Sequence, residues 1–231
     1  MEINILLAVV VAILAISAVN GYRKGFLRIA ISLFTIILVI CVVTVISPYI
    51  SNYLTNHTKV YDHLKTKVVE VFADNNAQYD NTIEENQIKT IESYDLPEII
   101  TSCLISNNKA EVYQALMVSL FEEYVAGYLA KMIINAISFI GSFLMLWIFI
   151  WFIIFSADII AKIPIIKGFN KLLGLFAGLI KGLIIVWVGF FVAIIFFGNT
   201  IGSQMLTYIN DSVILTILFN NNLLAKFITG V

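Results

Sequence analysis

Residues 164–198 read PIIKGFNKLLGLFAGLIKGLIIVWVGFFVAIIFFG, and this stretch decides the fold. A basic segment is followed by a long apolar run, in which Gly174, Gly178 and Gly182 recur every fourth residue. Residues spaced four apart share one face of a helix, and glycines leave that face without side chains. The pattern therefore predicts a membrane-spanning helix that packs closely against another helix.

The composition of the whole chain is that of a membrane protein. Apolar residues make up 60% of the chain and charged residues 13%, whereas a soluble globular chain carries about 25% charged residues. The mean hydropathy is +0.95. Because a helix needs ~20 mostly apolar residues to cross the hydrocarbon layer, we expect an all-α integral membrane protein. Four stretches can span, at residues 3–19, 29–46, 132–155 and 172–197.

The distribution of charge predicts the orientation. The first apolar stretch is preceded by Glu2 and followed by three cations at residues 23–28, which is the reverse of a secretory signal, so we expect an uncleaved span. These cations and the basic segment at 158–181 mark two short turns as cytoplasmic. The connection at 49–130 carries five lysines and twelve acids, a net charge of −7, and is expected outside. Four spans then place both termini outside.

The chain divides into two transmembrane hairpins, an outer cap and a tail. In the cap we expect helical structure from residue 50 to 72, a loop at 73–87, a helix that starts at Pro97 and stops at Asn107, and one continuous helix from Ala110 to Tyr128 that runs into the third span. The tail is predicted to hold an amphipathic helix at 203–229 that lies at the membrane interface. The hairpins are residues 1–48 and 131–198, the cap is 49–130, and the tail is 199–231.

Small and polar residues inside the spans predict which helix faces meet. A small-residue face of the first span, a polar face of the third span and the glycines of the last span are expected to form the core between helices. For the third span we favour hydrogen bonds between helices over a polar pathway. The first face holds Ala8, Ala12 and Ala15, and the second holds Asn135, Ser138 and Ser142.

Lys181 is the only charge deep inside a predicted span. The spans contain no acid and no histidine, which argues against a carrier driven by protons or ions. The aliphatic stem of Lys181 can carry its ammonium to the cytoplasmic face. We favour this snorkelling over a role in binding a substrate.

Motifs for catalysis and cofactor binding are missing from the sequence. It contains no Gly-x-Ser-x-Gly, no His-Glu-x-x-His and no phosphate-binding glycine-rich loop. His57 and His63 are six residues apart on a predicted helix and point to different sides, and Cys41 and Cys103 are placed too far apart to form a disulfide. We therefore expect no catalytic residue, no cofactor, no metal ligand and no nucleic-acid partner.

Two elements of the sequence resemble the colicin V production protein family of bacterial inner-membrane proteins. The first, Lys24-Gly25-Phe26-Leu27-Arg28 with Ser32-Leu33, is similar to an Arg-Gly-Phe-x-Arg-Glu-x-x-Ser-Leu element at the start of the family's second span. The second, Leu173-Gly174 with Gly178 and Lys181-Gly182, is similar to an Asp-Arg-x-Leu-Gly-x-x-x-Gly-x-x-Arg-Gly element at the start of its last span. Ile29, Asn170 and Lys181 stand where the family pattern has Glu, Asp and Arg, so any ion pair between those acids and arginines is absent here.

The resemblance implies a bacterial inner-membrane protein linked to toxin production or export and to envelope physiology, without a defined molecular activity. We favour a non-enzymatic assembly or export factor. A small transporter or channel subunit that acts as an oligomer is the second interpretation, and an intramembrane enzyme is the third. The expected partners are the lipid bilayer and either another membrane protein or a second copy of the chain.

Overall fold

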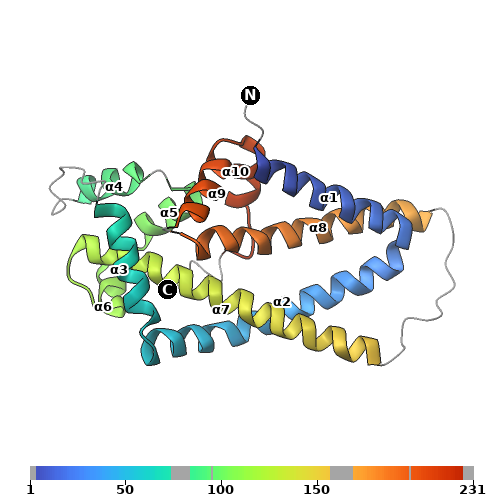
Figure 1. The fold of residues 1–231 in the computed structure, drawn as a ribbon, viewed down its shortest axis with the longest axis horizontal. Helices are drawn as coiled ribbons and strands as arrows, with labels where there is room; N and C mark the ends of the chain where they lie inside the picture. The colour runs from blue at the N-terminus through green and yellow to red at the C-terminus, as the bar shows by residue number, and fades with distance from the viewer. Residues whose placement is uncertain (1–3, 74–83, 95, 157–168, 198, 226–231) are drawn as a thin grey trace.

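The computed structural model describes residues 4–73, 84–94, 96–156, 169–197 and 199–225. The regular elements in these ranges are all helices, which confirms the predicted fold class (Figure 1). Four helices are long and apolar enough to cross a membrane, and each contains most of one predicted span. They are α1 (Ile5–Lys24), α2 (Phe26–His57), α7 (Phe121–Ser156) and α8 (Phe169–Ile195).

The four long helices pack as two pairs. α1 lies alongside α8, and α2 lies alongside α7 (Figure 1). The first pair is antiparallel, because Gly21 faces Gly174 and Gly178 whereas Ser17 faces Gly178 and Gly182. α8 also contacts α2 and α7, and these contacts join the two pairs into one bundle.

The hydrophobic core is centred on the first half of α7. Tyr124, Tyr128 and Phe139 are fully buried there. The ring of Phe139 meets Phe191 of α8 edge to face, with 5.1 Å between the ring centroids. The second half of α7 differs, because most of its large apolar side chains from Leu144 onward are exposed. In a bilayer these side chains are positioned to contact lipid.

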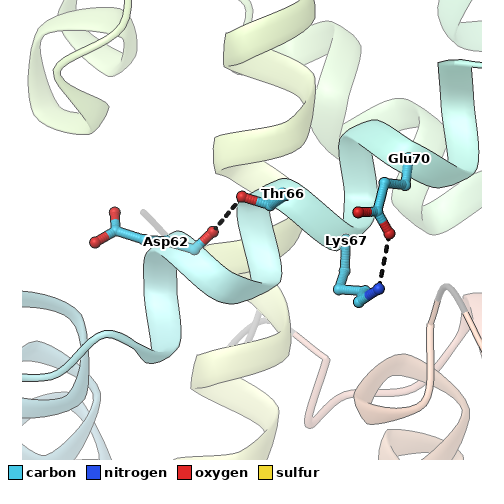
Figure 2. A network of polar contacts seen from close by, with 4 residues as sticks. All are labelled: Asp62, Thr66, Lys67 and Glu70. Atoms are coloured by element: carbon cyan, nitrogen blue, oxygen red, sulfur yellow. Dashed lines mark hydrogen bonds and ion pairs between the residues drawn. The ribbon is translucent and has the colours of Figure 1, made fainter.

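Four short helices form the cap around the start of α7: α3 (Val60–Ala73), α4 (Glu84–Ser93), α5 (Glu98–Ser106) and α6 (Ala110–Leu116). α3 packs against α7 and carries polar contacts of its own. The Lys67 ammonium lies 2.7 Å from the Glu70 carboxylate, and the Thr66 hydroxyl donates to the Asp62 carbonyl oxygen (Figure 2). α5 follows Pro97 and ends at Asn107, as predicted.

Two predictions for the cap were wrong. α4 begins at Glu84, inside the stretch predicted to be a loop, because a polar helix has little apolar periodicity to reveal it. The predicted continuous helix at 110–128 is broken at Met117, which adopts a left-handed conformation with φ of 54°. This reversal allows both Leu116 and Val118 to be buried. A new helix then starts, and the Glu123 carboxylate accepts a hydrogen bond from the Ser119 backbone N–H.

The tail is amphipathic, as predicted, but it forms two helices that pack on the bundle. α9 (Thr200–Asn210) and α10 (Val213–Asn220) are separated because Ser212 caps the second helix, its hydroxyl accepting from the Leu215 N–H. The Trp187 indole of α8 donates to the Leu218 carbonyl, and the Asn4 amide at the start of α1 donates to the Tyr208 carbonyl. Part of the predicted tail helix, from residue 226, lies outside the described residues. The buried face of the tail holds Leu206, Ile209, Leu215 and Phe219.

Candidate functional site

The contact between α1 and α8 is formed by residues without large side chains. We call it the glycine seam, made of Ser17, Gly21 and Gly25 on one side and Gly174, Gly178 and Gly182 of α8 on the other. A Cβ atom on Gly21 would overlap the Gly174 carbonyl oxygen, and one on Gly178 would overlap the Ser17 carbonyl oxygen. The two backbones are therefore in direct contact along the seam. The three glycines that the sequence singled out all lie in it.

The alanine face of α1, predicted to be part of the core between helices, lies outside it. Ala8, Ala12 and Ala15 are all exposed. The seam uses Ser17, Gly21 and Gly25 instead, which also recur every fourth residue. This repeat was a signal in the sequence that could have identified the correct face, because two glycines permit a closer approach than three alanines.

The turn between α1 and α2 is held by a residue from α8. Gly25 has φ of 79°, a conformation that favours glycine, and it offers no side chain to cap α2. The Asn170 side-chain oxygen accepts from the Leu27 N–H at 3.4 Å and so supplies the cap from another helix. A Cβ on Gly25 would overlap the Asn170 amide. We call this meeting of the end of α1 and the starts of α2 and α8 the turn junction.

Basic residues surround the turn junction. Lys24, Phe26 and Arg28, which the sequence singled out with Gly25, are exposed here. Lys171 at the start of α8 holds its ammonium 5.7 Å from the centroid of the Tyr22 ring, within range of a cation–π interaction. The structure thus brings the predicted basic turn and the start of the last span to one end of the bundle.

Lys181 lies deeper than the other cations, and its ammonium donates to the Ser32 hydroxyl at 2.7 Å. Its side chain is half-buried, and the positive charge of Lys24 repels its ammonium. Ser32 is seven residues beyond Gly25, about 10 Å along α2 at ~1.5 Å per residue. Ser32 is three residues inside the predicted span at 29–46, so the ammonium lies near the end of that span, and the snorkelling interpretation stays a prediction.

Charge is separated between the two ends of the bundle. Among the described residues, every acid lies between Asp62 and Glu123 or is Asp211. The ion pairs formed between described residues, Lys67–Glu70 and Lys89–Glu85, are both in the cap. The cations of the turn junction therefore have no described carboxylate nearby, and the potential at that end is positive.

The second pair of long helices meets through side-chain hydrogen bonds. The Ser51 hydroxyl donates to the Asn135 amide oxygen at 2.5 Å, and the Lys131 ammonium donates to Asn52 and Thr55 at 3.3 and 3.2 Å. Asn135, Ser138 and Ser142 are 7%, 2% and 5% exposed, so the predicted polar face of α7 is buried. The Ser142 hydroxyl donates within α7 to the Ser138 carbonyl, and the Ser138 hydroxyl has no partner among the described residues, so of these three side chains Asn135 makes the bond to α2. We call the contact between α2 and α7 the polar seam, made of Ser51, Asn52 and Thr55 of α2 and Lys131 and Asn135 of α7.

The residues with metal-binding or redox chemistry lie apart from one another. His57 ends α2 and stacks on Tyr53, with 5.1 Å between the ring centroids, while His63 belongs to α3. Cys41 and Cys103 are both free thiols. Within the described ranges no group of three or more His, Cys, Asp or Glu side chains could hold a metal ion.

Comparison with known proteins places these seams in a recognised family. The family model described as colicin V production protein matches residues 8–77 and 110–222. The matched segments contain the glycine seam, the turn junction and the polar seam, and they leave out α4 and α5. Searches of curated proteins and of solved structures gave no match.

Proposed function

This chain belongs to the colicin V production protein family, and from this premise we propose that it is a non-enzymatic membrane factor in toxin production or secretion, or in envelope homeostasis. The observation that carries the proposal is the extent of the family match, which includes α2, α7 and α8 completely and most of α1. The chain is a membrane protein with four candidate spans. A partner, either another membrane protein or a second copy, completes the proposal.

The chemistry of the bundle supports an assembly role. The glycine seam joins backbones directly, and the polar seam joins side chains to one another, so both contacts stabilise a fixed arrangement of helices. The long helices that form these seams expose apolar side chains on their other faces, which suits contact with lipid or with another membrane protein.

We propose that the chain spans the bacterial inner membrane four times, with the turn junction in the cytoplasm and the cap and both termini outside. The positive turn junction and the acidic cap support this orientation. Labelling of single cysteines with an impermeant reagent tests it, after Cys41 and Cys103 are replaced by serine. Met117, which is 92% exposed in the cap, should label from outside as M117C, whereas Y22C at the junction should label only after permeabilisation. The reverse pattern would overturn the orientation.

The function itself is tested in the native host. Deletion of the gene should reduce toxin release, and the full chain should restore it. Crosslinking in the membrane should then recover a defined partner. The alternative, a transporter or channel subunit, predicts solute flux through purified protein in liposomes. Flux that accounts for the host phenotype would replace our proposal by the alternative.

A further inference from the structure

We propose that the chain binds an anionic phospholipid through its phosphate group, at a site formed by the Lys181 ammonium and the Ser32 hydroxyl beside Lys24 and Arg28. The proposal does not depend on the role in toxin production. It also does not depend on which leaflet holds the turn junction.

The Lys181 ammonium has fewer hydrogen-bond acceptors than donors in the described structure. It bonds to Ser32, three residues or about 5 Å inside the predicted span at 29–46, and so lies near the end of that span. A half-buried ammonium at this level is costly unless it is paired. It has three N–H donors, and the described structure gives it one neutral acceptor, the Ser32 hydroxyl. The nearby Thr35 hydroxyl donates to the carbonyl of Ile31 instead.

The chain has a shortage of counter-ions around its predicted spans. From residue 3 to 61 and from 124 to 210, which hold the four predicted spans, the sequence contains a single acid, Asp158. The same ranges contain nine cations. Among the described residues no carboxylate lies at the turn junction, so the Lys181 ammonium has no described counter-ion there.

The positions of the cations near Lys181 indicate which kind of anion would bind. Several cations meet at the turn junction, and Arg28 lies one helical turn from Ser32 on the same face of α2. A group of cations at this level, between membrane helices, suits a phosphate, which accepts several charge-assisted hydrogen bonds at once. A single carboxylate would satisfy fewer of these donors.

The apolar surface beside the site indicates a phospholipid as the source of the phosphate. Ile31, next to Ser32, and Ile180, next to Lys181, are 48% and 53% exposed. These apolar side chains flank the polar pair on the outer surface of the bundle, where acyl chains would lie against them. The arrangement therefore offers a phosphate site with apolar surface beside it, which matches a phospholipid better than free phosphate.

The test uses the full chain purified in a neutral detergent, with thermal unfolding followed during titration. Phosphatidylglycerol should raise the unfolding temperature in a saturable way, and phosphatidylcholine and inorganic phosphate should not. In Lys181→Met the phosphatidylglycerol titration should shift to about tenfold higher lipid or more, because a charge-assisted hydrogen bond is lost. Lys181→Arg should keep the response.

Lys131→Met is the matched control. Lys131 is also a half-buried lysine in a long helix with side-chain oxygen partners, but it belongs to the polar seam. This variant should respond to phosphatidylglycerol as the wild type does. If Lys181→Met does not fold, Ser32→Ala gives the same information, with a smaller shift in the same direction.

Three results would overturn the proposal. Equal stabilisation by phosphatidylcholine would show that lipid acts only as a solvent for the apolar surface. Equal stabilisation by inorganic phosphate would show that the site takes free phosphate. An equal loss in Lys131→Met and Lys181→Met would show that the lipid acts on the net charge of the protein and not on this site.

Discussion

The glycine seam and the polar seam join two pairs of long helices by opposite means. In the glycine seam the backbones of α1 and α8 touch because the side chains are missing. In the polar seam α2 and α7 are linked by hydroxyl, amide and ammonium groups. Lipid is as apolar as a leucine side chain, so the hydrophobic effect does not drive the glycine seam where it lies inside a bilayer. The polar seam begins at Ser51, five residues beyond the predicted span at 29–46, so it lies at the cap end of the bundle. The comparison therefore isolates close packing from hydrogen bonding.

The two seams should differ in their tolerance of change. Backbone contact leaves no room for a new atom, so any added side chain separates the helices. A hydrogen bond between side chains has a net value of only about 0.5–1.5 kcal/mol, and its loss does not force the helices apart. We expect substitutions in the glycine seam to cost more than substitutions in the polar seam.

The largest effect is expected for Gly178→Leu. The new side chain would overlap the backbone of Ser17 and push α8 away from α1, which should cost about 1–3 kcal/mol or prevent accumulation of folded protein. Thermal unfolding in detergent and abundance in the membrane measure this change.

Gly189→Leu is the control for that prediction. Gly189 belongs to the same helix and is exposed, and a Cβ atom added to it would meet no described atom of another element within 4 Å. The variant should unfold at the wild-type temperature or slightly above it, because glycine is a poor helix former. Equal losses in both variants would mean that α8 tolerates no leucine anywhere, and the comparison of seams would lose its basis.

A smaller loss is expected for Asn135→Ala in the polar seam. Removing the amide deprives the buried Ser51 hydroxyl of its acceptor, which should cost about 0.5–1.5 kcal/mol, the net value of a typical intramolecular hydrogen bond. The double variant with Ser51→Ala completes a mutant cycle, and the two changes should be less than additive. Strict additivity would show that the pair contributes nothing of its own, and a loss larger than that of Gly178→Leu would reverse the order of the two seams.

The sequence predicted the helices of this fold better than their contacts. Span positions and the glycine face of α8 follow from local spacing, which a sequence displays directly. The partner face on α1 does not follow from local spacing. Both its alanine face and the face with Ser17, Gly21 and Gly25 carry small residues, so only tertiary packing selects one of them. The break at Met117 was missed because a left-handed residue there is not a glycine.

The candidate site was predicted in part for the same reason. The basic residues and glycines around the turn were identified from their spacing. The hydrogen bond by which Asn170 caps the start of α2 at Leu27 joins residues 143 positions apart, and the bond between Lys181 and Ser32 joins residues 149 positions apart. No local pattern encodes such pairs, so the departure at Asn170 looked like a lost charge when its amide in fact caps a helix.

The hydrogen bond between the Asn170 side chain and the Leu27 N–H provides the third prediction. Asn170→Ala should destabilise the protein by about 0.5–1 kcal/mol, at the low end for a capping residue because the bond is long and exposed. Asn170→Asp should be at least as stable as the wild type, since a carboxylate at a helix N-terminus is favoured by the helix dipole. Unfolding temperatures of the two variants measure this difference. A destabilised Asp variant would show that the positive turn junction does not act on this position.

The smallest effect is expected at the surface of the cap, for Lys67→Ala. Its ion pair with Glu70 has the same short distance, 2.7 Å, as the bond between Lys181 and Ser32, but both side chains are more than half exposed (Figure 2). Water already solvates these charges, so the pair should contribute about 0.2–0.5 kcal/mol, and salt should remove even that. Unfolding measured at low and high salt checks the value. A loss above about 1 kcal/mol at high salt would contradict the prediction, because it would mean that this face of α3 is desolvated in the native assembly by a partner pressed against the cap.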